Sequence, residues 1–142
     1  MVLPDVNVLV YAHRADANRH TEYRRWLEDL VNGDAAYGIS ELALSGFVRV
    51  VTHPRVFHDP TPLEEALQFA DQLRTRPNCV LMAPGGRHWD IFEGLCRAAS
   101  AKGDLIPDAY FAALAIEHGT EWVTTDRDYA RFPGLRWSHP LL

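Results

Sequence analysis

Short apolar segments alternate along this chain with longer segments whose apolar residues recur at helical spacing. Val2–Tyr11 is almost continuously apolar and rich in β-branched residues, which predicts a strand buried on both faces. Further strands are predicted at Tyr37–Ile39, Cys79–Met82, Glu121–Thr124 and Leu135–Ser138. Helices are predicted at Thr21–Val31, Glu41–Thr52, Pro62–Arg76, Arg87–Ala101 and Pro107–His118. Strands separated by helices predict a parallel sheet covered by helices on both faces.

Length and composition indicate one domain. The chain has 142 residues without a repeat or linker, and its 47% apolar residues can fill one core, so residues 1–142 are expected to fold together. Cys79 and Cys96 match no metal-ligand spacing and are expected to be reduced thiols. Without a signal-peptide pattern or a long apolar run, we expect a cytoplasmic protein that does not enter a membrane.

The charge balance restricts the choice of function. The formal net charge is −5, whereas a simple nucleic-acid-binding module is usually basic. A net negative charge is compatible with a nuclease, because acidic side chains can hold cations. The acidic residues are therefore the first candidates for catalytic or metal-binding residues.

Four acidic residues occupy comparable places in the predicted elements. Asp5 lies in the first strand, Glu41 and Asp108 open helices, and Asp126 follows the strand that ends at Thr124. Each alone has an ordinary explanation as a turn residue or as a partner of a helix dipole. Ligands of parallel α/β sheets bind outside the carboxyl ends of the strands, so all four are expected to converge at that edge.

Asp5 is the hardest of the four to explain as a purely structural residue, because it interrupts an apolar run. A buried, unpaired carboxylate is costly, and several carboxylates close together repel one another. A hard divalent cation such as Mg²⁺ removes that conflict, since it prefers oxygen ligands. Asn7 could orient a ligand or a water molecule without adding negative charge. The pattern predicts a metal site for phosphodiester hydrolysis, with one or two ions.

Four sequence blocks carry a resemblance to a known family. The first, Asp5-Val6-Asn7-Val8-Leu9, resembles the opening motif of PIN domains, and the others resemble the later conserved blocks of that family. These others are Ser40-Glu41-Leu42 with Phe47 and Val48, Pro107 through Ala115, and Thr124 through Tyr129. The blocks extend from Asp5 to Phe132, and the resemblance therefore covers nearly the whole chain.

The resemblance implies a three-layer PIN-like α/β fold, with a central parallel sheet of four to five strands and helices on both faces. It implies a Mg²⁺- or Mn²⁺-dependent endoribonuclease of the VapC toxin type, which cuts structured RNA such as tRNA or rRNA and so inhibits translation. A VapB-type antitoxin and a homodimer are implied as partners. By the same resemblance, the catalytic and metal-binding residues are Asp5, Glu41, Asp108 and Asp126, with Asn7 and Thr125 in support. Asp128 could replace Asp126, which we favour because it is closer to the strand end.

Three arginines are secondary candidates for contacts with RNA or with an antitoxin. Arg49 shares a predicted helix face with Ser45 and Glu41, since these residues are spaced by four. Arg55 and Arg127 could line a path for RNA, because phosphate contacts supply most of the affinity for nucleic acid.

Other functions remain open at this point. A phosphatase of the haloacid-dehalogenase class also begins with an aspartate on its first strand, but it expects a second one where Asn7 stands. A PIN-like module could bind RNA or protein without cutting, although all four acidic positions are filled. A PIN nuclease of RNA maturation, outside a toxin pair, is the third alternative.

Overall fold

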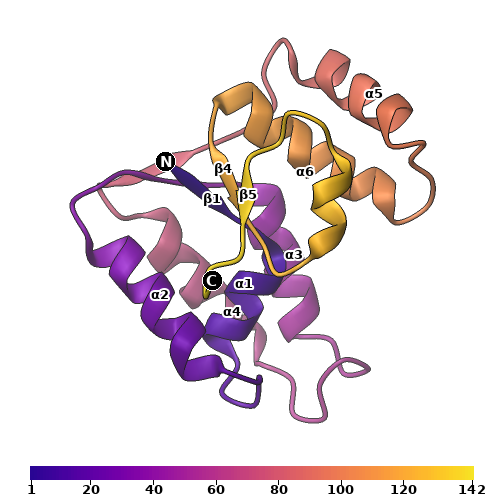
Figure 1. Ribbon diagram of the computed structural model, residues 1–142. Helices are drawn as coiled ribbons and strands as arrows, with labels where there is room; N and C mark the ends of the chain where they lie inside the picture. The colour runs from indigo at the N-terminus through magenta and orange to yellow at the C-terminus, as the bar shows by residue number, and fades with distance from the viewer.

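The computed structural model describes residues 1–142 and confirms the predicted alternation of strands and helices (Figure 1). The strands are β1 (Val2–Pro4), β2 (Tyr37–Ile39), β3 (Cys79–Leu81), β4 (Glu121–Val123) and β5 (Trp137–Ser138). The helices are α1 (Val6–His13), α2 (His20–Asn32), α3 (Glu41–Val51), α4 (Leu63–Arg74), α5 (His88–Ala98), α6 (Leu105–His118) and the 3₁₀ helix η1 (Arg127–Arg131).

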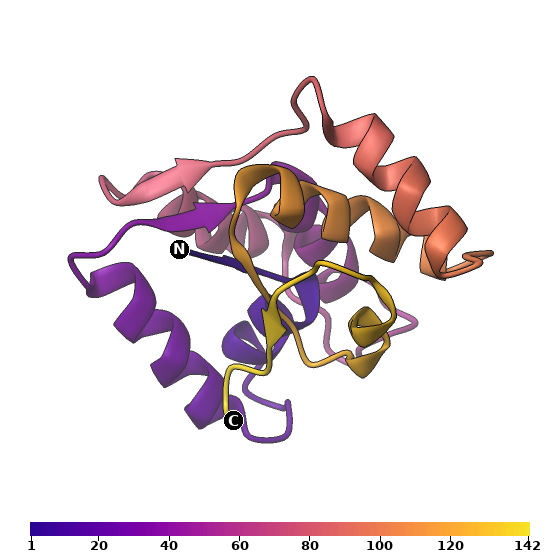
Figure 2. The same cartoon turned by 45° about the horizontal axis from the view of Figure 1, so that its top comes forward.

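All strand pairings are parallel, as predicted. β4 lies between β1 and β5 in a three-stranded sheet, and β2 pairs with β3 in a separate two-stranded sheet. β1 also lies close to β2, so the two sheets are neighbours in space (Figure 2). The chain has five parallel strands, but they do not form the single central sheet of four to five strands that was predicted, because hydrogen bonding divides them into a sheet of three and a sheet of two.

The prediction of a single strand over Val2–Tyr11 is wrong. The strand ends at Pro4, and residues 6–13 form α1. An apolar run satisfies a buried helix as well as a buried strand, and periodicity alone does not separate the two. α1 packs against α2 and α3, and its residues Val8, Leu9 and Val10 are all buried.

Two apolar clusters lie on opposite sides of the strands and give the molecule its layers. One combines α1, α2, α3 and α4, and the other is built mainly from α5, α6 and the segment around η1. Leu3 belongs to the second cluster while Val2 packs against the first, as expected for neighbouring residues of a strand. No helix combines the length and apolar character needed to cross a membrane.

α3 sits close to α1 because Gly46 faces Val6. A Cβ atom on Gly46 would lie 3.0 Å from Cγ2 of Val6, a spacing tighter than ordinary van der Waals contact. The start of α3, with Ser40 capping it and Glu41 as its first residue, follows directly from β2. The carboxyl ends of β1, β2 and β4 therefore all lead into segments that carry predicted site residues.

Candidate active site

Asp5 lies where β1 ends and α1 begins. Its backbone N–H donates to the carbonyl oxygen of Val123 at 2.8 Å, which continues the pairing of β1 with β4. Its side chain caps α1, because Oδ1 accepts a hydrogen bond from the N–H of Val6 at 2.6 Å. The residue is 6% exposed, so its carboxylate is held at the carboxyl edge of the sheet with little access to water.

Thr124, buried at the end of β4, connects the polar groups at this edge. Its Oγ1 donates to Oδ2 of Asp5 at 2.7 Å and accepts from the N–H of Asp126 at 3.1 Å. Nδ2 of Asn7 lies 3.3 Å from the same Asp5 oxygen, and Oδ1 of Asn7 accepts from the N–H of Thr125 at 3.3 Å. These bonds join the start of α1 to the segment after β4 in one network.

Asp108 and Asp126 reach this edge from two further elements. Asp108 lies in the first turn of α6, and Asp126 precedes η1 and accepts a hydrogen bond from the N–H of Asp128 at 2.9 Å. The hydroxyl of the buried Tyr129 donates to Oδ1 of Asp108 at 3.2 Å. Tyr129 therefore ties η1 to α6 and holds one side of the Asp108 carboxylate.

The carboxylates influence one another electrostatically. Burial above all, with smaller contributions from the charges of Asp108 and Asp126, raises the pKa of Asp5 from 3.8 to about 6, against the opposing hydrogen bonds from Thr124 and the N–H of Val6. Burial also raises the pKa of Asp108, again with contributions from Asp126 and Asp128. Asp5, Asp108 and Asp126 thus form an acidic group whose full ionisation is unfavourable without a compensating cation.

Glu41 is placed differently from these three aspartates. Its carboxylate is 61% exposed and forms an ion pair with Arg74 of α4, with Oε2 at 2.8 Å from Nε. It begins α3 at the carboxyl end of β2, as predicted, but its side chain is bound to a cation of the protein itself. The structure therefore brings three of the four predicted carboxylates together and leaves the fourth engaged elsewhere.

The donor set of the aspartates suits a hard divalent cation. Three carboxylates with mutual repulsion offer the oxygen ligands that Mg²⁺ and Mn²⁺ prefer. As positioned in the structure, no group of three or more His, Cys, Asp or Glu side chains is close enough to form a complete metal site.

The secondary candidates lie on the surface. Arg49 and Arg55 are exposed and form no ion pair, and Arg49 lines a groove with Glu41 and Ser45 on α3, as the spacing predicted. Arg127 is the exposed first residue of η1 and directly follows Asp126. Thr125 donates its backbone N–H to Oδ1 of Asn7, and its supporting role stays a prediction.

Sequence reasoning missed two residues of the network, Thr124 and Tyr129, as groups that position the carboxylates. Thr124 could have been found from its place at the end of a buried strand, where side chains meet the carboxyl edge. Tyr129 stands three residues after Asp126, but nothing in the sequence indicates that its hydroxyl contacts Asp108. Both residues act on carboxylates that were predicted.

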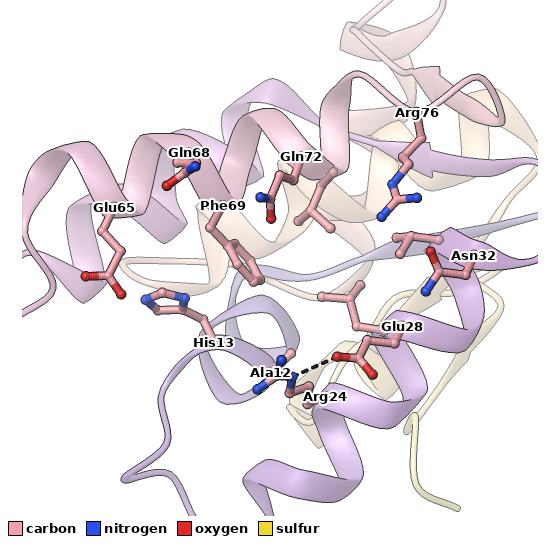
Figure 3. Close-up of a pocket in the computed structure, with 13 residues that line it drawn as sticks. Ala12, His13, Arg24, Glu28, Asn32, Glu65, Gln68, Phe69, Gln72 and Arg76 are labelled. Carbon is pink, nitrogen blue, oxygen red and sulfur yellow. Dashed lines mark hydrogen bonds and ion pairs between the residues drawn. The ribbon is translucent and has the colours of Figure 1, made fainter.

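A separate pocket of about 450 Å³ lies between α2 and α4, away from the carboxylates (Figure 3). Leu27, Phe69 and Leu73 contribute apolar surface to it. Its polar side chains include His13 and Glu65, which lie near each other in Figure 3. None of the predicted site residues lines this pocket, so it is not part of the acidic site.

The family model of the PIN domain matches residues 2–135, which is nearly the whole chain. This chain belongs to the PIN domain family. Its PIN domain is 48% identical over 141 residues to Ribonuclease VapC43 of Mycobacterium tuberculosis, a match that covers 99% of this chain and 96% of that protein. The fold predicted from the sequence blocks is thereby confirmed.

Solved structures share this PIN fold at much lower sequence identity. VapBC2 from Rickettsia felis, bound to a DNA fragment from its promoter, has a TM-score of 0.71 at 20% identity and covers 98% of both chains. VapC20 of Mycobacterium tuberculosis, a toxin that cleaves the sarcin-ricin loop, has a TM-score of 0.67 at 14% identity, covering 96% of this chain and 99% of that one. At these identities the two structures establish the fold alone.

Proposed function

We propose that this PIN domain is a divalent-metal-dependent endoribonuclease and the toxin of a type II toxin–antitoxin pair, acting in the cytoplasm on structured RNA such as tRNA or rRNA. The observation that carries the proposal is the group formed by Asp5, Asp108 and Asp126 at the carboxyl edge of the parallel strands. Names of relatives support it, since Ribonuclease VapC43 is 48% identical along almost the full chain.

The residues of this chain have separable tasks in the proposed reaction. Asp5, Asp108 and Asp126 would hold the Mg²⁺ or Mn²⁺ ion, and Glu41 would join them after leaving Arg74. Thr124 fixes the orientation of Asp5 by donating to Oδ2, and Tyr129 does the same for Asp108. When bound, the cation supplies an activated water and stabilises negative charge on the phosphate.

Asp126 fits the fourth acidic role better than Asp128. Asp126 raises the pKa of both Asp5 and Asp108, and its backbone N–H is bound to Thr124. Asp128 is exposed, and its backbone N–H serves to hold the Asp126 carboxylate. We therefore retain Asp126 as the proposed ligand and assign Asp128 no direct role.

The decisive experiment is cleavage of total cellular RNA by the purified protein with Mg²⁺ or Mn²⁺. We expect discrete fragments that disappear with EDTA, and a loss of rate of about a hundred- to a thousandfold for Asp108→Asn. The control is Asp104→Asn, which changes an exposed carboxylate just before α6. Folded protein that binds RNA but never cuts it would indicate the alternative, a binding module.

An antitoxin of the VapB type is the proposed protein partner. Several solved PIN-fold structures are toxin–antitoxin complexes, among them VapBC2 from Rickettsia felis. A basic side chain of the partner that reaches the carboxylates would neutralise the acidic site. The pocket between α2 and α4, with apolar and polar side chains, suits an amphipathic segment of the same partner (Figure 3). Growth arrest on expression of this chain, relieved by co-expression of a VapB-type protein encoded in a neighbouring reading frame, would support the pairing.

A homodimer is also proposed. An apolar groove of about 440 Å³ lies between α3, α5 and α6 and is lined by Phe92, Ile106 and Phe111 among others. Leu42 also lines this groove and is 53% exposed, so the groove presents apolar surface that a second copy could cover. Light scattering of the purified protein should give the dimer mass, and Leu42→Glu should give the monomer mass.

A further inference from the structure

A groove of about 490 Å³ between α3 and α4 begins beside the acidic site. Glu41, the first residue of α3, and Arg74, the last residue of α4, both line it. Because these two side chains are paired, the start of α3 lies beside the end of α4. α3 directly follows β2, so this end of the groove lies at the carboxyl edge of the strands.

The floor of this groove is apolar. Leu44 and Val48 contribute to it from α3, and Leu67 and Ala70 contribute from α4. Leu67 is 40% exposed, so part of this apolar surface is open to a ligand. None of the α4 residues that line the pocket of Figure 3 lines this groove, and the two sites therefore use different faces of α4.

The charged side chains of the groove are two arginines and two carboxylates, namely Arg49, Arg74, Glu41 and Asp71. Their charges cancel while Glu41 stays in the groove. Arg49 is exposed and lies eight residues along α3 from Glu41, or roughly 12 Å by the rise of an α-helix. Arg74 contacts Glu41 through Nε alone, at 2.8 Å, and the two terminal nitrogens of its guanidinium group form no hydrogen bond within the protein.

The pair of Glu41 and Arg74 is suited to an exchange of partners. The two side chains are 61% and 40% exposed, and an exposed ion pair contributes little to stability. A phosphate offers the guanidinium group the same kind of acceptor as a carboxylate and can bind it through two parallel hydrogen bonds. Loss of Glu41 from the groove leaves two arginines against Asp71, so the groove acquires a net positive charge.

We propose that this groove binds the backbone of single-stranded RNA through Arg49 and Arg74, and that Arg74 exchanges between Glu41 and a phosphate; this rests on the ribonuclease function proposed above. Two cations separated along a groove match a chain of phosphates, and the apolar floor between them offers surface to an unstacked base. The movement of Glu41 towards the aspartates would thus complete the metal site and free Arg74 for RNA at the same time.

The test measures binding of a fluorescein-labelled oligouridine by fluorescence anisotropy in EDTA. Glu41→Gln removes the carboxylate that occupies Arg74, so the affinity should rise by up to about fivefold, and the slope of log affinity against log salt should steepen by about 0.7. In an Arg74→Gln background the same substitution should give no gain. The gain and its loss together measure the exchange without a metal ion and without cleavage.

Arg49 is tested in the same assay. Arg49→Gln should weaken binding and make the salt slope shallower by about 0.7, because one phosphate contact is lost. Arg49→Lys should keep most of the affinity, since it retains the charge. The matched control is Arg25→Gln, which neutralises an exposed arginine on α2 and should leave the affinity close to wild type.

The matched control for Glu41→Gln is Glu28→Gln. It removes one negative charge and frees Arg24 on α2 from an exposed pair of the same kind, with Nε 2.7 Å from Oε1. Because neither residue lines the groove, the affinity should stay close to wild type.

Several outcomes would overturn the proposal. A gain for Glu41→Gln that is equal with and without Arg74, or a gain of the same size for Glu28→Gln, would exclude the exchange. Equal losses for Arg49→Gln and Arg25→Gln, or no binding of oligouridine by the wild type and by Glu41→Gln, would exclude the groove. Cleavage of cellular RNA by the wild type in any of these cases would leave the ribonuclease function intact. The expected binding results without cleavage in Mg²⁺ or Mn²⁺ would keep the groove and reject that function.

Discussion

The two sides of the acidic site are held in different ways. On the side of β1 and β4, Asp5 is buried and fixed by hydrogen bonds from Thr124 and from the backbone of Val6. On the side of α3, Glu41 is mostly exposed and held only by the exposed Arg74. Buried, shared hydrogen bonds define a single geometry, whereas an exposed ion pair contributes little and exchanges readily. The fold therefore preorganises one half of the site and leaves the other half to respond to a ligand.

The largest change in folding stability is expected for a substitution of Asp5, whose charge is unfavourable in its buried position. Raising the pKa of Asp5 from 3.8 to about 6 corresponds to about 3 kcal/mol of folding free energy. The pKa of Asp5 is higher in the folded state than in the unfolded state. The contribution of Asp5 to folding stability is therefore fully present below pH 4 and is lost as the pH rises through 6. Asp5→Asn should thus be about 3 kcal/mol more stable than the wild type at pH 7 in EDTA, with little difference near pH 4.

Urea denaturation of both proteins across this pH range measures the difference, and the comparison cancels the other titrating groups. Saturating Mg²⁺ or Mn²⁺ should stabilise the wild type and not Asp5→Asn, since only the former keeps the ligand. An Asp5→Asn variant that is less stable than the wild type at pH 7 would show that the charged Asp5 carboxylate does not destabilise the folded protein.

The next largest change in stability is expected for a substitution of Thr124, whose hydroxyl is hydrogen-bonded to both Asp5 and the N–H of Asp126. Thr124→Val removes a donor from Asp5 and an acceptor from the N–H of Asp126, so unfolding should become easier by about 2 kcal/mol. The Asp5 pKa should rise further, because the Thr124 hydrogen bond lowers it. Thr125→Val is the control, since only the backbone of Thr125 takes part. Equal stability of the two variants would argue against the network.

Tyr129→Phe should have a smaller effect of about 1 kcal/mol, because one hydrogen bond to the half-buried Asp108 is lost. That hydrogen bond lowers the pKa of Asp108, so its loss should move the acidic limb of the pH–rate profile to higher pH. Tyr110→Phe on the same helix as Asp108 is a control, as the Tyr110 hydroxyl forms no hydrogen bond. A pH profile identical to the wild type would remove Tyr129 from the site.

Much of the site could be predicted from the sequence, because its residues lie at the ends of strands and helices that the apolar pattern reveals. Asp108 and Asp126 were expected at a helix start and after a strand, and they lie there. The helix at 6–13 was missed because a continuous apolar run does not reveal whether Asp5 lies within a strand or caps a helix. The pair between Glu41 and Arg74 joins residues 33 positions apart, and no local pattern predicts such a contact.

The hydroxyl that contacts the carboxylates belongs to Thr124 and not to Thr125, whose supporting role the resemblance implies. Both threonines follow a buried strand, and which side chain points into the site depends on the exact residue at which the strand ends. β4 ends at Val123, so Thr124 is buried at the edge while Thr125 is partly exposed. Sequence patterns place strand ends only to within a few residues, which is coarser than this choice requires.

The smallest change in stability is expected for Arg74→Gln. This variant also tests directly whether Glu41, on the exposed side of the site, takes part in metal binding. With Arg74 and Glu41 exposed by 40% and 61%, losing their ion pair should change the free energy of unfolding by less than about 1 kcal/mol. The freed Glu41 carboxylate should nevertheless bind Mn²⁺ together with the aspartates, so calorimetry should show a several-fold higher affinity. Arg97→Gln, which breaks the exposed pair with Glu93 on α5, should leave the affinity unchanged. If Arg74→Gln does not change the Mn²⁺ affinity, Glu41 does not bind the ion, and the preorganised aspartates are the whole of the metal site.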